Sequence, residues 1–205
     1  MKNMTAPKYS MAFTTGALFH HESVKLAERY ATFKQWNEVR NAVIAENLLQ
    51  ARTVNTLRRV ANEVIARLKT LSAQELGFLV EAGYTDQAYI FWLAVCRRYT
   101  FIGDFAVDVL HAKFATLNSS ITYDDYAVFF NKKAEWHNEL DRIAPVTKTK
   151  VRQTLFKMMR EAGLLDKNDT ILPVVPSATL SDLLADIQPR ERMFFPLAAL
   201  TRRPY

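Results

Sequence analysis

The chain has 205 residues, of which 49% are apolar, so it is long enough to bury a core as one large domain or two small ones. Glycine is scarce, at five residues, while 13 Phe and 8 Tyr are present, which favours helices over a turn-rich β-sandwich. The 27 basic and 21 acidic residues leave a net charge of +6 at pH 7. A charge of this size is compatible with a polyanionic partner but does not require one.

Cys96 is the only cysteine, which excludes an intramolecular disulfide. The longest apolar run covers residues 88–96 and is far shorter than the roughly 20 residues of a membrane-spanning helix. The first residues lack the charged and apolar regions of a signal peptide. We therefore expect a cytoplasmic protein with no membrane partner.

In chain order, residues 1 to about 15 lack a helical period and are expected to form a loosely held arm. Helical patterns follow near residues 21–30, 36–49 and 53–71. Ser72 and Glu75 match a capping box, in which serine and glutamate side chains satisfy free amides of the first turn. Further helices are expected over about 85–99 and 101–117.

The polar trio Asn118-Ser119-Ser120 is the clearest break in the chain. It predicts an N-terminal helical domain over residues 1–118 and a C-terminal domain over 122–205, packed together as one globule. Thr122 can cap the next helix, and a short helix then ends before Pro145. Another helix should end at Gly163, followed by a small hairpin over 164–175 and a final helix starting near Ser181.

Basic residues concentrate in two segments. Residues 142–160 hold six bases and no acid, and residues 40–69 hold six bases against two acids, so together these segments exceed the net charge of the whole chain. On a helical wheel that starts at Val151, the apolar side chains of the first segment form one face. The opposite face carries Thr149, Lys150, Gln153, Lys157 and Arg160, with Arg152 at its flank.

A short helix, a break at Pro145 and a helix with this outer face are typical of a helix-turn-helix, whose second helix enters the DNA major groove. A polar hairpin after Gly163 would form the wing of a winged helix, with Lys167 and Asn168 at its tip. Lysine and arginine neutralise phosphates, while glutamine and arginine read base edges. The alternative is a solvated charged face, but such faces normally interleave both signs of charge.

The other basic segment follows the same logic. Its apolar positions form one face of a helix over about 53–68, which leaves the polar residues outside. It predicts a second helix-turn-helix in the N-terminal half, although one long helix with a basic rim is an open alternative. The candidate DNA-binding residues of both segments are Arg52, Asn55, Thr56, Arg59, Arg67, Lys148, Thr149, Lys150, Arg152, Gln153, Lys157, Arg160, Lys167 and Asn168.

No nucleotide-binding, hydrolase or metalloprotease motif occurs in the sequence, and we expect no enzyme activity and no cofactor. Asp104, Asp108 and His111 share a helix face and could in principle bind a metal, but a solvent-facing polar stripe is the better interpretation. The fold class expected from all these patterns is all-α: a multi-helical globule with a C-terminal winged helix-turn-helix.

Several short matches indicate a family. The opening Tyr9-Ser-Met-Ala-Phe-Thr-Thr-Gly-Ala-Leu18, the run Asn47-Leu-Leu-Gln-Ala-Arg-Thr53 and the ending Arg160-Glu-Ala-Gly-Leu-Leu165 resemble the BrxA family of bacteriophage exclusion (BREX) systems. The resemblance implies a small non-catalytic component of a bacterial phage-defence system that also contains a methyltransferase, ATPases and a phosphatase-like protein. It transfers no functional residue.

The combined expectation is a monomer that binds double-stranded DNA and other BREX proteins. BrxA proteins are also similar to the NusB antitermination proteins, so RNA binding is one alternative. A protein adaptor whose basic helices dock on acidic BREX subunits is the other.

Overall fold

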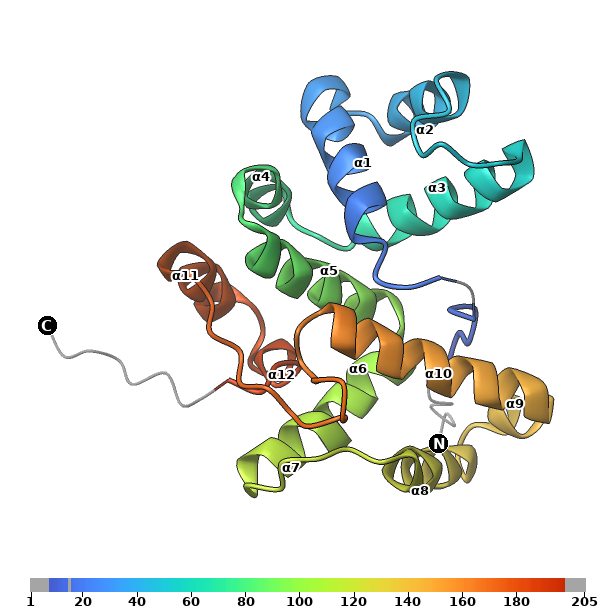
Figure 1. The fold of residues 1–205 in the computed structure, drawn as a ribbon, viewed down its shortest axis with the longest axis vertical. Helices are drawn as coiled ribbons and strands as arrows, with labels where there is room; N and C mark the ends of the chain where they lie inside the picture. The colour runs from blue at the N-terminus through green and yellow to red at the C-terminus, as the bar shows by residue number, and fades with distance from the viewer. Residues whose placement is uncertain (1–7, 15, 198–205) are drawn as a thin grey trace, which may run out of the picture. The chain divides into compact units, whose positions relative to one another are not determined.

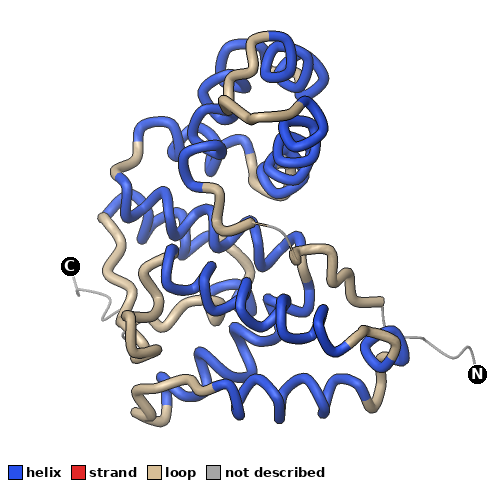
Figure 2. The backbone as a smooth tube through the Cα atoms, turned by 45° about the vertical axis from the view of Figure 1, so that its right-hand side comes forward, coloured by secondary structure: helices blue, strands red, loops and turns tan. Residues whose placement is uncertain are grey.

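The computed structural model of the chain describes residues 8–14 and 16–197, and the regular structure within them is helical (Figures 1 and 2). Among these residues, β-pairing consists of isolated bridges and builds no strand. The expectation of an all-α fold is therefore confirmed. In the described part of the chain, no helix combines the length and apolar character that crossing a bilayer requires.

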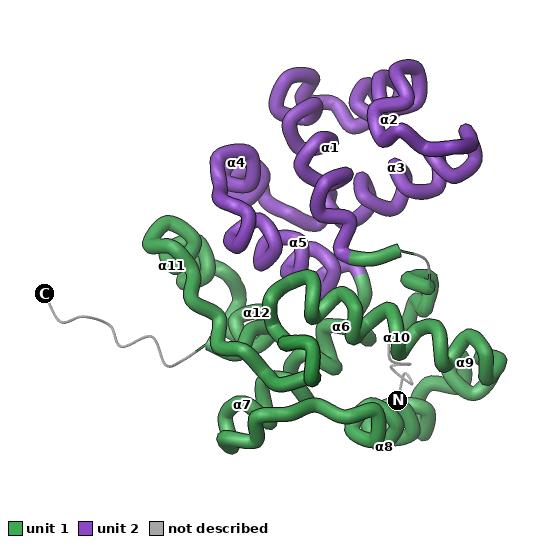
Figure 3. Tube along the Cα trace, viewed as in Figure 1, with its two compact units in different colours: residues 1–17, 99–205 green, residues 18–98 purple. Residues whose placement is uncertain are grey.

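The chain divides into two compact units, residues 18–98 and residues 1–17 with 99–205 (Figure 3). The sequence predicted a division at Asn118–Ser120, further along the chain. The difference has a physical reason, because Phe101 and Phe105 are fully buried and pack against Phe129, which lies beyond the polar trio. A polar break marks a loop, but it does not say which neighbours a preceding helix will bury.

The unit of residues 18–98 contains α1 (His20–Phe33), α2 (Trp36–Ala45), α3 (Val54–Leu68), α4 (Ala73–Glu81) and α5 (Tyr84–Arg98). Helix α5 is buried on all sides from Gln87 to Cys96, which explains why its sequence is apolar without a period. The capping box at the start of α4 is confirmed. Its Glu75 also forms an ion pair with Arg97 of α5, with 2.7 Å between carboxylate oxygen and guanidinium nitrogen.

Two separate helices, α2 and α3, replace the alternative of one long helix. They are joined by residues 46–53, in which Asn47 takes a left-handed conformation (φ 43°) and its side chain bonds both backbone groups of Ala51. Thr53 then caps α3 by accepting a hydrogen bond from the Thr56 amide at 3.2 Å.

The other unit contains one continuous helical run, α6 (Thr100–Phe105), the π-helical turn η1 (Ala106–His111) and α7 (Ala112–Ala115). It continues with α8 (Tyr123–Ala134), α9 (Asn138–Asp141), α10 (Pro145–Glu161), α11 (Ala178–Asp186) and α12 (Pro189–Arg192). Its core is aromatic: the Phe101 ring contacts the rings of Tyr126, Phe129 and Phe130. The capping box at Thr122 is formed with Asp125.

The N-terminal arm is anchored in this core within its described part, contrary to expectation. Tyr9 and Phe13 are buried and their rings contact Phe101, with centroid separations of 5.4 and 6.3 Å. The sequence signal was misleading because a segment can bury aromatic side chains without being helical. The part of the arm before residue 8 lies outside the described residues.

Helix α10 ends as the sequence indicated. Gly163 adopts φ 70°, its amide bonds the Arg160 carbonyl, and the Leu164 amide bonds the Met159 carbonyl, which together form a Schellman motif. The following segment turns back over residues 166–169 and makes one antiparallel bridge, between Leu165 and Ile171. The expected β-hairpin is thus a tight turn with a single bridge between its arms.

Candidate nucleic-acid interface

Helix α10 buries the face that the helical wheel selected. Val151, Leu155, Met158 and Met159 have no exposed surface, and Ala162 has 1%. Phe156 is also fully buried, although it falls away from the apolar stripe in the sequence. Helix α10 is therefore held on more than one side, which leaves a narrower exposed strip than an isolated amphipathic helix would have.

That exposed strip carries four of the predicted residues, Thr149, Lys150, Gln153 and Lys157. Lys148, Arg152 and Arg160 are half-buried at its borders. The strip therefore combines cations with side chains that can hydrogen-bond to base edges or phosphates.

Two of the bases at the C-terminal end of α10 have acidic partners. The Arg160 guanidinium forms an ion pair with Asp169 at 2.6 Å, and the Lys157 ammonium lies 3.7 Å from the Glu161 carboxylate. Arg160 is thereby committed to fixing the turn after the helix. Lys157 is 58% exposed and its pair is long, so it stays available to an anion.

The bases in the N-terminal half of α10 have a different environment. Lys150 is exposed, and within the described residues none of Lys148, Lys150 and Arg152 forms an ion pair with a carboxylate. Aromatic rings hold two of them instead. The Lys148 ammonium lies 4.8 Å from the centroid of the Phe130 ring, and the Arg152 guanidinium lies 4.1 Å from that of Tyr123. This half keeps its positive charge.

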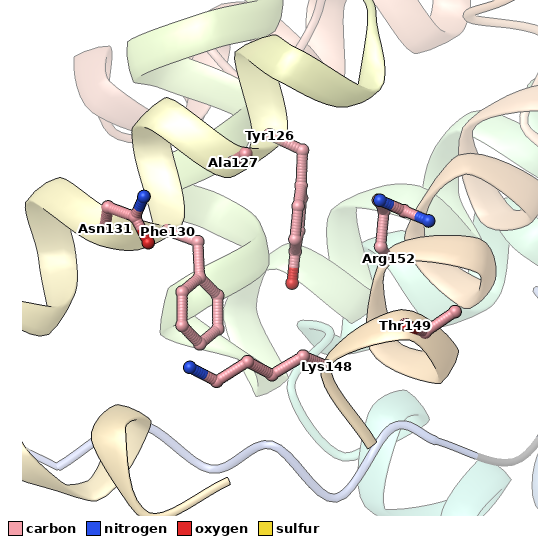
Figure 4. A pocket seen from close by; sticks show the side chains of 7 residues that line it. All are labelled: Tyr126, Ala127, Phe130, Asn131, Lys148, Thr149 and Arg152. Carbon is pink, nitrogen blue, oxygen red and sulfur yellow. The ribbon is translucent and has the colours of Figure 1, made fainter. Parts of the chain in front are cut away.

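A pocket of about 160 Å³ lies beside these residues, between α8 and α10 (Figure 4). Tyr126, Ala127, Phe130, Asn131, Lys148, Thr149 and Arg152 line it. Sequence reasoning missed the four residues from α8. No signal in the sequence pointed to them, because their pairing with α10 depends on tertiary packing.

The turn after α10 presents Lys167 and Asn168, which are exposed as expected. Asp166 holds the turn, since its carboxylate accepts hydrogen bonds from the amides of Asn168 and Thr170, both at 2.8 Å. The hydrogen bond from the Thr170 amide lowers the pKa of Asp166 most strongly, and the one from the Asn168 amide lowers it further. Burial acts in the opposite direction but is outweighed, so the pKa lies below its usual value. These two hydrogen bonds fix the backbone on either side of Lys167 without a β-hairpin.

The candidate surface on α3 belongs to the other unit. Arg52, Asn55, Thr56 and Arg59 are all exposed near the N-terminal end of the helix. Thr56 also shares a 3.0 Å hydrogen bond with the Thr53 hydroxyl, so its side chain takes part in the helix cap. Arg52 precedes the N-cap Thr53, and together with Asn55, Thr56 and Arg59 on the first two turns it forms a polar basic surface at the start of α3.

Arg67, by contrast, was expected on the exposed face, and this expectation is wrong. The residue is 2% exposed, its Nε donates to the Glu63 carboxylate at 2.7 Å, and its guanidinium lies over the Phe19 ring. A long arginine stem packs readily inside a helix bundle when its charged end is paired. Arg67 is thus a buried structural residue and is not available to DNA.

Among Asp104, Asp108 and His111, Asp108 is exposed as a solvent-facing stripe requires, whereas Asp104 is buried. Asp104 is 9% exposed and accepts hydrogen bonds from Tyr9, Lys133 and Arg190, while Asp108 pairs with Lys133 at 3.0 Å. His111 lies at hydrogen-bonding distance, 3.3 Å, from the Phe195 carbonyl. Within the described residues no group of His, Cys, Asp and Glu side chains is arranged to hold a metal ion.

A sequence model of the BrxA family matches residues 7–188, which is most of the chain. The chain belongs to the BrxA family. Two relatives named "BREX protein BrxA" are similar to it. The one from Escherichia coli O9:H4 (strain HS) is 23% identical over 74% of this chain and 71% of its own length. The one from Bacillus cereus (strain H3081.97) is 25% identical over 65% of this chain and 66% of its own length.

The fold recurs in a solved structure of an uncharacterized protein from Magnetospirillum magneticum. The likeness covers 93% of this BrxA-family chain and 99% of that protein, with a TM-score of 0.77 and 18% identity. At this identity the comparison shows the shared fold alone.

Proposed function

We propose that this chain is a non-enzymatic, double-stranded DNA-binding component of a bacterial BREX phage-defence system. The defence role follows from the BrxA family and from the BREX proteins that share its sequence. DNA binding rests on one observation above all: Lys148, Lys150 and Arg152 carry their charge without a carboxylate partner among the described residues.

The physical argument is one of desolvation and charge. Cations that are already paired with carboxylates gain little from a phosphate, because the new contact replaces an existing one. Cations without a carboxylate partner break no ion pair when they meet a phosphate backbone. Thr149 and Gln153 beside them supply neutral groups that suit phosphate or base-edge contacts.

The α3 surface and the turn tip are assigned to the same function. Arg52 and Arg59 add charge near the start of α3, and Lys167 adds one beyond α10. In this proposal α10 and its turn act as a winged helix-turn-helix and α2 with α3 as a second one. Two motifs in one chain can occupy two half-sites, which fits a monomer.

A salt titration with random duplex DNA tests the proposal. The logarithm of the association constant should fall linearly with the logarithm of salt concentration, with a slope of about −0.9 for each phosphate neutralised. The double variant Lys150→Glu with Lys157→Glu should weaken binding by at least about tenfold and reduce the slope by about 2. Lys34→Glu with Lys69→Glu is the matched control, since both residues are exposed at helix ends outside the candidate surfaces.

If both double variants weaken binding equally, DNA binding depends only on the net charge of the protein, and the assignment of the α10 surface is wrong. DNA affinity that does not respond to salt would remove the proposal altogether. Thermal unfolding of each variant separates loss of binding from loss of fold.

RNA binding of the NusB type is a second candidate, and one observation favours it. Trp136, which follows α8, is 80% exposed, and an exposed indole can stack on an unpaired base. Competition between duplex DNA and a loop-containing RNA at equal salt decides between the two. An RNA preference of about tenfold that is lost in Trp136→Ala would replace the DNA assignment.

Docking on an acidic BREX subunit remains the third candidate. In this case the same cations would face carboxylates, and partner capture would be sensitive to salt but not to nuclease. Co-purification with operon neighbours, with and without nuclease at fixed salt, distinguishes this candidate from DNA binding. Partners that are lost on nuclease treatment alone are held through nucleic acid.

A further inference from the structure

The pocket between α8 and α10 contains a polar group that its surroundings leave unused. Tyr126 is only 4% exposed, and its hydroxyl has no hydrogen-bond partner among the described residues. Figure 4 shows this hydroxyl pointing from α8 toward the part of α10 that carries Lys148 and Thr149. A buried hydroxyl without a partner costs folding free energy, so its presence calls for an explanation.

A second unpartnered group belongs to Arg152, whose side chain also lines the pocket. The Nε of Arg152 is buried and makes no hydrogen bond within the described residues, although its guanidinium rests on the Tyr123 ring. Both unused groups can donate a hydrogen bond. Burial raises the pKa of Tyr126 and the charge of Arg152 opposes this only in part, so the hydroxyl stays protonated at neutral pH.

The rest of the lining has the same chemical character. Lys148 adds a second positive charge, Thr149 adds a hydroxyl, and Asn131 adds an amide, while no acidic residue lines the pocket. Cation–π contacts with Phe130 and Tyr123 hold Lys148 and Arg152 in place without neutralising them. Two fixed cations and several neutral donors select a compact dianion with oxygen acceptors.

The volume of the pocket sets the size of the ligand. At about 160 Å³, it is comparable with an engineered cavity of about 150 Å³ that holds benzene, so it has room for about six heavy atoms. A phosphate group fits this limit, whereas a complete nucleotide must leave its sugar and base outside.

We propose that this pocket is a phosphate-binding site, in which the Tyr126 hydroxyl donates to a phosphate oxygen and Lys148 and Arg152 supply the opposing positive charge. The site shares Lys148, Thr149 and Arg152 with the proposed DNA-binding surface but not Lys150, Gln153 or Lys157. Phosphate binding in the pocket does not require the chain to bind DNA. The phosphate belongs either to a free small molecule or to a nucleic acid end that enters the pocket.

The Tyr126→Phe variant tests the site because it removes only the unused hydroxyl. The free protein should keep or slightly increase its melting temperature, since the variant relieves an unpaired buried group. Phosphate affinity should fall about tenfold, because a hydrogen bond to a charged ligand is lost. Tyr123→Phe is the matched control: it makes the same chemical change on a residue that is 42% exposed and leaves the ring beneath Arg152.

Binding of inorganic phosphate is measured by calorimetry at constant ionic strength, with acetate as the monoanionic comparison. Melting temperature in phosphate buffer is read only as a difference between variants, because phosphate also stabilises proteins by exclusion from their surfaces. A second variant, Lys148→Gln, removes one of the two charges and should also weaken phosphate binding.

Two further ligands identify the source of the phosphate. Adenosine monophosphate is compared with adenosine, and a short duplex with a 5′-phosphate is compared with the same duplex without it. Tighter binding of the monophosphate that depends on Tyr126 supports a free ligand, and tighter binding of the phosphorylated duplex supports a nucleic acid end.

Phosphate that binds wild type and Tyr126→Phe equally, or does not bind at all, overturns the proposal and leaves a water-filled pocket only. The two tests remain distinguishable although both proposals use Lys148 and Arg152, because the DNA test changes Lys150 and Lys157, which do not line the pocket.

Discussion

The Tyr9 hydroxyl donates a hydrogen bond to the Asp104 carboxylate, which also accepts from Lys133 at 2.9 Å and from Arg190. One carboxylate therefore ties the N-terminal arm to α6, α8 and α12 within a single unit. Burial opposes ionisation of Asp104, but the hydrogen bonds from Tyr9 and Lys133 outweigh it and hold the pKa of Asp104 below its ordinary value. Burial likewise raises the pKa of Tyr9, with the hydrogen bond to Asp104 acting in the same direction.

Asp104→Asn should destabilise the protein by about 3 kcal/mol at neutral pH, because it leaves buried donors opposite a neutral amide. Since folding lowers the pKa of Asp104, the stabilisation is fully present above the unfolded-state value of 3.8 and is lost as pH falls through the lower folded value. The difference in unfolding free energy between wild type and variant should therefore shrink as the pH falls below 3.8. Urea unfolding at several pH values measures it, and a difference that grows on acidification would contradict the assignment.

Arg67 and Arg59 should respond in opposite ways to the same substitution. Arg67→Ala is expected to cost about 3 kcal/mol of stability, because it removes the ion pair with Glu63 and empties a buried volume. Arg59→Ala should change stability by less than about 0.5 kcal/mol, since the residue is exposed, but it should weaken DNA binding. Thermal unfolding and DNA titration on both variants provide the comparison. A stable Arg67→Ala protein would refute the structural role.

Gly163 and Gly77 provide a second matched pair. Gly163→Ala should destabilise by about 1 kcal/mol, because the Schellman motif after α10 requires φ 70°, which strains an L-residue. Gly77→Ala should stabilise by up to about 1 kcal/mol, since Gly77 lies within α4, is exposed, and a methyl group there meets no atom within 4 Å. Chemical denaturation of the two variants reports both signs, and effects of equal sign would count against the local explanation.

Lys167 should contribute one phosphate contact from the turn after α10. Lys167→Ala is expected to reduce the slope of log affinity against log salt by about 1 without changing the melting temperature. Lys34→Ala serves as the control, since it removes the same charge from an exposed helix end. If both variants alter the slope equally, the turn has no specific part in binding.

The helical fold and much of α10 could be predicted because their signals are local. The apolar stripe from Val151 to Ala162, the capping boxes at Ser72 and Thr122, and the left-handed Gly163 each depend on neighbours within a few residues. The exposure of Lys150, Gln153 and Lys157 follows from the same periodicity. The BrxA family was likewise recognisable from short runs of sequence, and the family comparison confirms it.

The errors arose where a side chain's fate depends on a distant partner. Arg67 falls outside the apolar stripe of α3, but the Phe19 ring and the Leu18 carbonyl contact its guanidinium and it is buried. Tyr9 lies in a segment without helical periodicity, yet Asp104, 95 positions later, holds it in the core. A helical wheel describes one helix in water and cannot show what another helix will cover.

The sequence by itself determined most of the helices, the two capping boxes, the position of the positive charge and the family. It did not predict the short helix α12 or the start of α11 at Ala178. Only the tertiary structure decided which cations keep their charge available: Arg160 is paired with Asp169, whereas Lys148 and Arg152 rest on the rings of α8. It also brought the unused Tyr126 hydroxyl beside them. The reason is that helix formation depends on bonds between residues four apart, whereas charge neutralisation and pocket formation depend on side chains that meet only when the chain packs.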